Sequence, residues 1–473
     1  MKASRYRHVL CVYPYRNDLK RARCFPPIGL EIIASILKPL CSEIDVVDLR
    51  HDRGQATDFL RPETDMVCFS VNWDRDADFV REQIRSIGPG RLVVVGGRHA
   101  TEIPEEWLRD CPNIDILVRG DGEEVIAEIA RGRPLESIEG ISYRRNGEIV
   151  HTANRDPGPI RDDTRPERSL RRTRYEIDVE GVGTGITFDT IMGSRGCPFN
   201  CKFCSFSLNP WGNKRRYSAR SPESVVDELA GIDADWVAFV DDIFTHDMDR
   251  VEAICDLIIK RGIRKHYIVN SRVEAAGRID VLRKMEQAGF AMLLLGLESA
   301  HDKTLRSMSK GFDVATLEKR FAILRGSRMI LNGYFILGCI GESEQDMLEI
   351  APFARRLGVD TIALSPLRTV PHDGLRQLVA DSPGYHISPK GFVYSDSVSL
   401  QDLRRIRRTI WRRFYTPAHV IRLLWKSLRS GIVTPKTSAR LVLASVRGWL
   451  RRCKHRRDKR NADKKNAAVA TEA

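Results

Sequence analysis

Apolar, β-rich segments alternate with helical patterns over most of the second half of this chain. The strand-like segments lie at residues 185–193, 236–242, 266–272, 292–299, 330–338 and 360–367. Helical patterns lie between several of them, at residues 221–232, 247–263, 278–290 and 343–359. The first helix has a clear start signal, because Ser221 is followed by Pro222 and Glu223. Six successive βα units predict a partial (β/α)6 barrel of the TIM type, with its ligand site at the carboxyl ends of the strands.

A second alternation occupies the first third of the chain. Strand-like segments at residues 8–14, 43–49, 65–71, 91–97 and 114–120 are separated in part by helical patterns at residues 28–40, 76–87 and 104–111. Continuous apolar strands between helices predict a doubly wound, Rossmann-like parallel sheet that is covered on both faces. Such sheets bind ligands at the carboxyl ends of their strands. The segments "GGRHAT" (96–101) and "RGDGEE" (119–124) fall at two of those ends.

Residues 136–180 do not show this alternation of strand-like and helical segments. Their segment "RDPGPIRDDTRPERSLRRTRYEI" is rich in Pro, Asp and Arg, and this composition predicts a connecting or extended packing segment. We therefore expect an α/β chain of four parts. They are a ligand-binding domain at 1–135, the connecting segment at 136–180, the barrel at 181–400, and a basic helical region with a disordered end at 401–473.

Cysteine usage indicates the compartment and the type of site. The 473 residues include eleven Cys, and 42% of the residues are hydrophobic. The N-terminus "MKASRYRHVLCVYPY" lacks the uninterrupted apolar region of a secretory signal, and no stretch approaches the roughly 20 apolar residues that cross a bilayer. We therefore expect a cytoplasmic chain with reduced cysteines, in which a cysteine cluster indicates a metal or redox site.

The segment "GSRGCPFNCKFCSF" follows the first barrel strand directly. Its three cysteines are Cys197, Cys201 and Cys204. Thiolates bind zinc and iron–sulfur clusters. A structural zinc site normally needs four ligands in two pairs, and a ferredoxin-type cluster would take a remote fourth ligand from Cys255 or Cys339. Three close cysteines suit a 4Fe–4S cluster with one iron left open for a substrate or cofactor, and chance spacing is the remaining alternative.

The segment resembles the signature of radical S-adenosylmethionine (SAM) enzymes, including the aromatic Phe203 before the last Cys. "AFVDDIFT", "GLESA" and "GYFILGCIGESEQD" are similar to later strand-end motifs of that family, and the resemblance covers roughly residues 185–370. It implies that the open iron binds SAM through the SAM amino and carboxylate groups. It also implies an electron donor such as flavodoxin or ferredoxin, cleavage of SAM to a 5′-deoxyadenosyl radical, and hydrogen abstraction from an unactivated carbon.

The same resemblance implies which residues contact SAM. They are Asp241 and Asp242 near the SAM amino group, Asn270 and Arg272 near the ribose or carboxylate, Gly296 and Glu298 at the next strand end, and Gly338 and Gly341 near the adenine, with Phe203 also in the cofactor site. Glycine permits a close approach of the main chain to a ligand, and polar residues at strand ends point into the barrel mouth. One departure is visible, because "GCIGES" has Cys339 and Ile340 where relatives often have Pro after the glycine. This bears on the conformation of the loop and not on the chemistry.

An α/β domain before such a barrel resembles the cobalamin-binding architecture of one large subfamily, the class B radical SAM methyltransferases. "VVVGGRHAT" and "IDILVRGDGEE" are similar to recurring fourth- and fifth-strand motifs of that subfamily. The implied cobalamin-binding positions are Gly96, Gly97, Thr101, Gly120 and Glu123. A bulky corrin needs backbone that is free of side chains, which accounts for the glycines. His51 in "DLRHDRG" has the wrong spacing and strand for a cobalt-ligand motif, and we expect neither His51 nor His99 to ligate cobalt.

A basic region ends the chain. Residues 404–465 contain 21 Lys and Arg against Asp458 and Asp463, a balance of +19, so the formal charge of +14 leaves −5 for the rest. Helical patterns at 417–430 and 435–452 set apolar stripes against cationic faces. Three interpretations stay open. They are helices packed over the barrel, attachment to an anionic membrane surface, and nucleic-acid binding. Nucleic-acid binding is supported only by the positive charge, since the sequence has no recognised RNA-binding module.

Together the resemblances predict a cobalamin-dependent radical SAM enzyme, specifically a C-methyltransferase acting on an unactivated carbon. Relatives act on hydrophobic molecules such as hopanoid lipids and tetrapyrroles, and the layout is similar to that of hopanoid C-3 methylases. We therefore expect a small hydrophobic substrate, which a peripheral membrane enzyme would lift from the bilayer. An oxidative cyclase with the same cofactors and a non-catalytic iron–sulfur or cobalamin sensor are the alternatives. No side-chain acid or base is expected, because little proton chemistry remains after hydrogen abstraction and methyl transfer.

Overall fold

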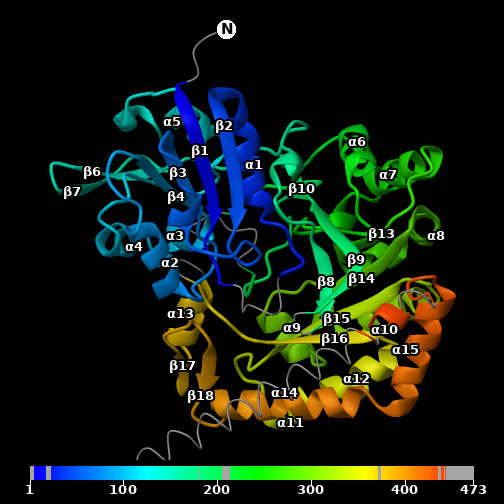
Figure 1. Cartoon of the computed structure of the whole chain (residues 1–473). Coiled ribbons are helices and arrows are strands. Elements are labelled where there is room, and N and C mark those ends of the chain that lie inside the picture. Colours follow the sequence, from blue (N-terminus) through cyan, green and yellow to red (C-terminus); the bar gives the residue numbers. More distant parts are fainter. Residues whose placement is uncertain are drawn as a thin grey trace, which may run out of the picture.

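Two α/β domains, each built on its own seven-stranded sheet, make up the computed structural model (Figure 1). The structure describes residues 5–16, 23–179, 182–204, 214–370, 374–434, 438–441 and 443. The N-terminal domain, blue to cyan in Figure 1, lies beside the green-to-yellow second sheet. This arrangement confirms the predicted fold class, a Rossmann-like domain followed by a partial barrel and a helical C-terminal region.

The N-terminal sheet has the strand order β2-β1-β3-β4-β5-β6-β7. Its first five strands pair in parallel, whereas β6 and β7 form an antiparallel hairpin at the edge. The strands are β1 (Tyr6–Tyr13), β2 (Cys41–Asp48), β3 (Thr64–Ser70), β4 (Leu92–Gly96), β5 (Ile116–Val118), β6 (Ile141–Arg145) and β7 (Glu148–His151). The hairpin was not expected, since it lies in the segment that the sequence indicated as a connection. It joins the sheet because Ile141 and Tyr143 are buried against the N-terminal core.

Helices cover both faces of this sheet, so its central strands are buried almost throughout. The helices are α1 (Ile28–Leu37), α2 (Ala77–Arg85), α3 (Arg98–Glu102), α4 (Pro104–Asp110) and α5 (Glu123–Ala130). Since α1 and α5 pack against each other, they share one face of the sheet.

The second sheet is an open half-barrel with the order β16-β15-β14-β13-β12-β9-β8. Six strands run parallel in chain order, and β8 pairs antiparallel at one edge. The strands are β8 (Glu176–Val179), β9 (Val182–Ile191), β12 (Trp236–Phe239), β13 (His266–Ser271), β14 (Phe290–Glu298), β15 (Ile330–Leu337) and β16 (Thr361–Pro366). All six predicted barrel strands are therefore present at the expected places.

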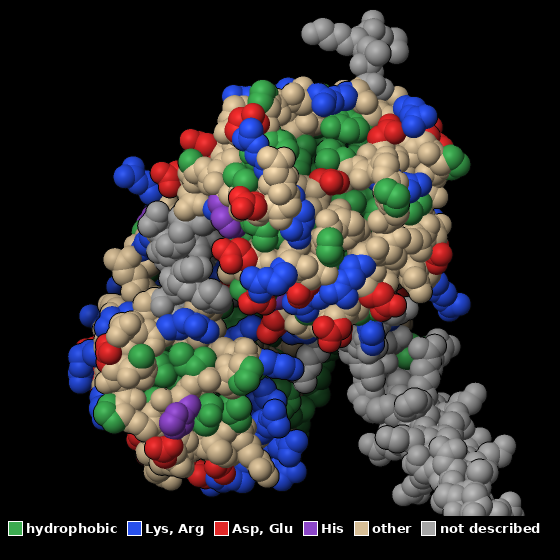
Figure 2. Space-filling model, turned by 90° about the vertical axis from the view of Figure 1, so that its left-hand side faces the viewer, with side chains coloured by type: hydrophobic (Ala, Val, Ile, Leu, Met, Phe, Trp, Pro, Cys, Tyr) green, Lys and Arg blue, Asp and Glu red, His purple; other side chains and the backbone are tan. Residues whose placement is uncertain are grey.

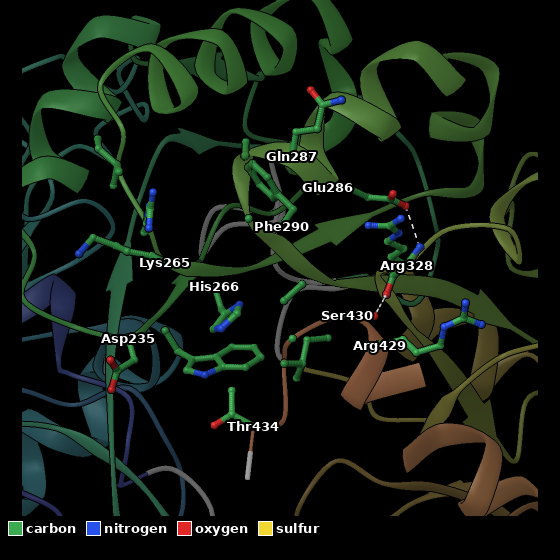
Figure 3. Close-up of a pocket in the computed structure, with 18 of the residues that line it drawn as sticks. Asp235, Lys265, His266, Glu286, Gln287, Phe290, Arg328, Arg429, Ser430 and Thr434 are labelled. Carbon is green, nitrogen blue, oxygen red and sulfur yellow. Dashed lines mark hydrogen bonds between the residues drawn. The ribbon is translucent and has the colours of Figure 1, made fainter. Parts of the chain in front are cut away.

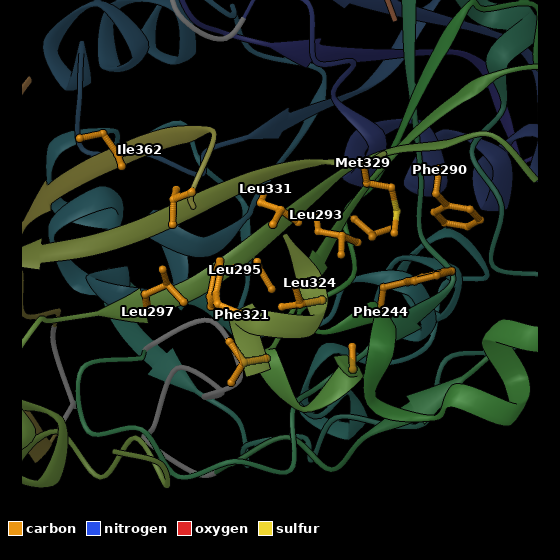
Figure 4. Packing of buried hydrophobic residues seen from close by; sticks show 14 of the residues in the cluster. Phe244, Phe290, Leu293, Leu295, Leu297, Phe321, Leu324, Met329, Leu331 and Ile362 are labelled. Atoms are coloured by element: carbon orange, nitrogen blue, oxygen red, sulfur yellow. The ribbon is translucent and has the colours of Figure 1, made fainter. Parts of the chain in front are cut away.

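The helices between these strands pack on the outer face of the half-barrel. They are α6 (Pro222–Gly231), α7 (Met248–Lys260), α8 (Ile279–Ala288), α9 (Asp302–Ser307), α10 (Val314–Leu324), α11 (Glu344–Leu348) and α12 (Ile350–Leu357). Figure 4 shows the outward side chains of β14, Leu293, Leu295 and Leu297, beside Phe321 and Leu324 of α10. Alternate residues of a strand face opposite sides, so the other side chains of β14 face the inside of the half-barrel.

The C-terminal region covers one side of the barrel. It comprises α13 (Gly374–Ala380), the hairpin β17 (Tyr385–Ile387) and β18 (Val393–Ser395), α14 (Leu400–Phe414) and α15 (Pro417–Arg429). Helix α14 packs on α11 and α12 through Leu403, Ile406, Ile410 and Phe414. Most of the second predicted tail helix and the predicted disordered end lie outside the described residues. None of the described helices is both long and apolar enough to cross a membrane.

Charge is distributed differently over the domains and the C-terminal region. Figure 2 shows acidic and basic side chains interspersed over the face that carries α4 and β6–β7. The outer face of α14, in contrast, exposes Arg404, Arg408, Arg412 and Arg413. The positive excess is thus concentrated in the C-terminal region, in line with the sequence count.

A buried ion-pair network joins the two domains. Arg171 of the connecting segment bonds to Glu31 of α1 and to Asp189 of β9, each at 2.7 Å. Glu31 and Asp189 are only 1% and 4% exposed. Close by, the Tyr175 hydroxyl donates to Asp48 at 2.8 Å. Since buried charges are stable only when they are paired, this network links the relative placement of the domains to the stability of the fold.

Candidate functional site

The cysteine segment forms a loop at the carboxyl ends of the barrel strands. It follows β9 and the short strand β10 (Ser194–Arg195), which pairs with β11 (Ser218–Ala219). The Lys202 amide donates to the carbonyl of Met308 at 3.0 Å, and the Cys204 amide donates to that of Cys201 at 3.1 Å. Gly196 has a φ of +82°, and a Cβ there would lie 2.4 Å from the carbonyl oxygen of Arg216. The loop therefore needs glycine at this point to pass beside the returning chain.

Two carboxylates after β12 hold the start of this loop. Asp241 is fully buried and accepts hydrogen bonds from the Gly193 amide at 2.7 Å and the Ser194 hydroxyl at 2.6 Å. Asp242 accepts from the Gly196 amide at 2.8 Å. Burial raises the pKa of both carboxyl groups. Both residues were expected near the SAM amino group, and the structure places their carboxylates on the backbone of the loop that carries the cysteines.

The next strand contributes a cation to the cysteine loop. Arg272, at the end of β13, is 7% exposed and lies with its Cζ 3.7 Å from the ring centroid of Phe199. Its Nη1 lies 3.8 Å from Sγ of Cys201, and its Nη2 donates to the carbonyl of Lys310 at 2.8 Å. The guanidinium thus places positive charge beside a sulfur of the cysteine loop. Asn270 lies nearby and donates to the Asp241 carbonyl at 2.9 Å.

Glu298 ends β14 in an unusual backbone conformation. Its φ is +68°, and the pairing with β15 shifts register between Gly296 and Glu298. Such a bulge re-aims a side chain, and here the carboxylate accepts from Lys310 Nζ at 2.8 Å. A Cβ on Gly296 would lie 2.5 Å from the Glu298 Oε1, so a larger residue there would displace this pair. Lys310 is also 5.5 Å from the ring of Phe203, which places the pair next to the cysteine loop.

Lys310 is a residue that sequence reasoning missed. It is 4% exposed, which is rare for lysine unless it is paired. It lies in a loop after α9, outside every motif, so nothing local indicates that it reaches the end of β14. Arg195 was also missed, although it stands inside the quoted cysteine segment.

The glycines expected near adenine lie around a second buried carboxylate. Glu342 accepts from the amides of Gly338 and Cys339, at 3.0 and 3.1 Å. Its carboxyl pKa is raised to about 8, chiefly by burial. A Cβ on Gly338 would lie 3.1 Å from Leu403 of α14, so this glycine permits close packing of that helix. The Gly341 amide donates to the hydroxyl of Tyr385 at 2.6 Å.

The two cysteines considered as a remote fourth ligand are packed in apolar surroundings. Cys255 belongs to the main barrel core, and Cys339 to a smaller cluster with Met308. Burial raises the pKa of the Cys255 thiol to about 12 and that of Cys339 well above its ordinary value. Both environments favour the neutral thiol and not a metal-bound thiolate.

The N-terminal domain has a pocket of about 320 Å³ at the carboxyl ends of β3, β4 and β5. All five residues implied as cobalamin-binding line it: Gly96, Gly97, Thr101, Gly120 and Glu123. Gly97 has a φ of +109°, and a Cβ there would lie 2.6 Å from the Val71 carbonyl oxygen. Thr101 links two of the turns, because its hydroxyl donates to the Gly97 carbonyl at 2.8 Å and accepts from the Gly120 amide at 3.2 Å. The glycine turns thus present bare backbone to the pocket.

Barrel residues complete this pocket. Arg215 lines it and pairs with Asp121, and Arg195 of the cysteine segment pairs with Glu123. Nη1 of Arg215 is buried and has no partner among the described residues. An unpartnered guanidinium nitrogen beside a glycine-lined cavity suits a bulky ligand that carries hydrogen-bond acceptors. The cavity therefore fits a cobalamin, and the ion pairs join it directly to the cysteine loop.

Neither of the two histidines lines this pocket. His51 Nε2 lies 2.8 Å from the Arg23 carbonyl oxygen, and its ring stands edge-on to Tyr175. His99 packs edge-on to Trp107. Their non-ligand interpretation stays a prediction.

The three cysteines of the loop fit an iron–sulfur cluster in donor type and position. They are partly exposed at the open end of the half-barrel, and burial, followed by the neighbouring Cys204 and Cys201, raises the pKa of the Cys197 thiol. Within the described ranges, no three Cys, His, Asp or Glu side chains converge as a metal site. The cluster assignment thus rests on thiolate chemistry, the loop position and Arg272.

A second large cavity, of about 750 Å³, lies at the opposite ends of the barrel strands (Figure 3). Its walls include the starts of β12, β13 and β14, where Trp236 and His266 face each other with ring centroids 4.8 Å apart. Arg429, Ser430 and Thr434 close it from the C-terminal region. Because it opens at the amino ends of the strands, this cavity is separate from the cysteine loop.

Comparisons with known proteins agree with these two sites. Residues 191–354 match the model of the radical SAM superfamily, and residues 18–130 match that of the B12 binding domain. An uncharacterised methyltransferase of Pyrococcus horikoshii is 30% identical over 375 residues, which are 74% of this chain and 78% of that protein.

Two further relatives differ in the reactions that their names describe. The anaerobic magnesium-protoporphyrin IX monomethyl ester cyclase of Cereibacter sphaeroides is 28% identical over 275 residues, 55% of this chain and 44% of the cyclase. The hopanoid C-3 methylase of Methylococcus capsulatus is 27% identical over 342 residues, 68% of this chain and 62% of the methylase. The solved structure of the methyltransferase TsrM from Kitasatospora setae, with cobalamin and a 4Fe–4S cluster bound, is similar with a TM-score of 0.68. It is 17% identical, and the match covers 87% of this chain and 92% of that chain.

Proposed function

This chain belongs to the radical SAM superfamily and carries a B12-binding domain, and on that premise we propose that it methylates an unactivated carbon of a hydrophobic small molecule. The single observation that carries the proposal is that ion pairs connect the N-terminal pocket to the cysteine loop of the barrel. Arg195 and Arg215 of the barrel pair with Glu123 and Asp121 at the rim of the N-terminal pocket. A methyl donor in the pocket and a radical source at the cysteine loop would therefore act on one substrate.

The chain's own residues have distinct roles in this proposal. Cys197, Cys201 and Cys204 would hold a 4Fe–4S cluster, and the glycine-lined pocket would hold cobalamin. When bound, these groups supply an electron for SAM cleavage and a methyl group for transfer. Asp241 and Asp242 keep the cysteine loop in place through its amides, and Arg272 places positive charge beside Cys201.

Lys310 and Glu298 form a buried polar pair beside the loop, and together with Asn270 we propose them as SAM-binding groups. An ammonium group suits the SAM carboxylate, and a carboxylate suits ribose hydroxyls or the SAM amino group. The backbone at Gly296, Gly338 and Gly341 and the ring of Phe203 are proposed as further contacts. A flavodoxin or ferredoxin is the proposed electron donor.

A hydrophobic substrate is favoured by the names of the relatives, since one acts on a hopanoid and another on a tetrapyrrole ester. The cyclase relative also supports the second candidate function, oxidative ring formation with the same cofactors and no methyl transfer. A non-catalytic sensor is the third candidate, and it would have no use for a SAM site.

The test is anaerobic reconstitution with iron, sulfide, methylcobalamin, SAM and a reductant, followed by incubation with lipid and pigment extracts. We expect 5′-deoxyadenosine and a product that is heavier by one methylene group. A product that has lost hydrogens without gaining carbon identifies the cyclase. Absence of reductive SAM cleavage in protein with a full cluster identifies the sensor and overturns the proposal.

A further inference from the structure

Helix α15 is amphipathic, but its apolar face points away from the protein. Four large apolar residues recur with helical spacing on one face: Ile421, Leu424, Trp425 and Leu428. Their exposures are 68%, 54%, 60% and 48% in that order. The residues that α15 buries are His419 and Ser427, which are polar. A helix that merely covers a barrel has the opposite arrangement.

Polar contacts fix this orientation. On the barrel side of the helix, His419 Nε2 lies 2.9 Å from the Asp360 carbonyl oxygen, and Lys426 donates to the Asp360 carboxylate at 2.5 Å. Beyond the end of the helix, the Ser430 hydroxyl donates to the carbonyl of Arg328 at 2.6 Å (Figure 3). The helix is therefore held by its polar side, and its apolar face is left as a surface.

Cations accompany this apolar face, since Arg429 lies 5.6 Å from the ring centroid of Trp425 and the outer face of α14 carries exposed arginines. From Arg404 to Arg429 the chain has nine Arg and Lys and neither Asp nor Glu. Trp411, near the end of α14, is 51% exposed and adds a second exposed indole. Tryptophans beside Arg and Lys are the side chains that anchor a protein at the boundary between headgroups and acyl chains.

We propose that the exposed face of α15, together with the cationic outer face of α14, docks on an anionic phospholipid surface. Nucleic acid would satisfy the cations but leave the apolar face in water. A second copy would cover the apolar face but bring together two sets of exposed arginines, Arg404, Arg408, Arg412 and Arg413 of each copy. An anionic bilayer satisfies both features, because headgroups meet the cations and the interface accepts the apolar side chains. This extends the proposed function by giving a hydrophobic substrate a route to the enzyme, and it stands on its own observations.

The test is flotation of the full chain with phosphatidylcholine vesicles containing about one third phosphatidylglycerol, against pure phosphatidylcholine vesicles. We expect strong binding to the anionic vesicles, weakened by salt. The triple variant Ile421→Ser/Leu424→Ser/Trp425→Ser should lose at least about tenfold in the partition coefficient. The control is Ile259→Ser/Ile323→Ser, which changes exposed isoleucines of α7 and α10 and should bind like the wild type.

A second variant keeps the test decisive if the triple variant misfolds. Arg412→Gln/Arg413→Gln changes exposed arginines and should lower binding to anionic vesicles by about fivefold per charge. Failure of the wild type to float, or equal flotation of wild type and both variants, overturns the proposal. A wild-type dimer that the triple variant converts to a monomer, without vesicle binding, also overturns it and assigns the face to a second copy. Reductive SAM cleavage in detergent-free buffer should be equal in all variants, so this test is independent of the catalytic proposal.

Discussion

The two strand-end sites of this protein are shaped in opposite ways. The N-terminal pocket owes its space to glycines in its lining, which have no side chain to fill it. The Thr101 hydroxyl connects its turns by hydrogen bonds to Gly97 and Gly120. The cysteine loop is shaped by charges, because Asp241, Asp242 and Arg272 each hold a specific backbone or sulfur atom. The first site should therefore be sensitive to added volume, and the second to the loss of a single partner. The substitutions at Cys204 and Gly29 below test this contrast directly.

The largest effect is expected at the cysteine loop. Cys204→Ser keeps the size of the side chain but removes a soft sulfur ligand, so cluster loading should fail. Reductive SAM cleavage should fall by more than about a thousandfold, or about 4 kcal/mol. Iron and sulfide content and 5′-deoxyadenosine yield are the measurements. Cys41→Ser, which changes a partly exposed cysteine of β2, is the control, and equal losses in both variants would exclude a specific role for the loop.

The ion-pair network between the two domains should come next. Arg171→Ala leaves Glu31 buried without its ion-pair partner and Asp189 with Arg168 alone, and the free energy of unfolding should drop by about 3–5 kcal/mol. Urea denaturation measures it. The matched control is Arg356→Ala, which breaks an ion pair whose side chains are 61% and 48% exposed. It should cost less than about 1 kcal/mol. An equal loss of unfolding free energy in the two variants would mean that the buried network stabilises the protein no more than an exposed ion pair does.

Added volume in the pocket should weaken cobalamin binding without harming the cysteine loop. Gly29 lines the pocket, and a Cβ there meets nothing within 4 Å. Gly29→Leu should lower cobalamin affinity by about 10- to 100-fold, from an overpacking cost of about 1–3 kcal/mol. Titration followed by visible absorbance measures the affinity. Gly88→Leu, outside the pocket, should bind cobalamin normally, and both variants should retain reductive SAM cleavage. Normal binding by Gly29→Leu would contradict the assigned pocket.

The most gradual effect concerns pH. The folded-state pKa of Glu342 is about 8, above its ordinary value of 4.5, so the folded chain keeps a proton that the unfolded chain has released. Stability from this group is therefore complete at low pH and falls as pH rises from about 4.5 to about 8, by about 1.4 kcal/mol per pH unit. Glu342→Gln removes this slope. Between about pH 4.5 and about pH 8, the unfolding free energy of the wild type should therefore fall more steeply than that of Glu342→Gln. Parallel curves for the two proteins would refute the assignment.

Much of the architecture follows from local pattern. The periods of the apolar residues predicted the parallel strands of both sheets, and the Ser221 cap is present, since its hydroxyl accepts from the Ser224 amide at 3.2 Å. The hairpin β6–β7 was missed because its few inward residues, such as Ile141 and Tyr143, are too short a pattern to stand out among polar neighbours. The positions that the resemblance implies as cobalamin-binding converge on one pocket because the carboxyl ends of adjacent parallel strands meet at one sheet edge.

The sequence by itself determined the two α/β domains, the cysteine spacing and the glycines of the pocket, because these depend on residues close together along the chain. Only the tertiary structure decided which distant groups meet. It paired Arg171 with Glu31, 140 residues away, and Lys310 with Glu298 across a bulge. It also turned the apolar face of α15 outward, because Asp360 binds the polar side of that helix. Helical periodicity defines an apolar face, but only the neighbours of the helix determine where that face points.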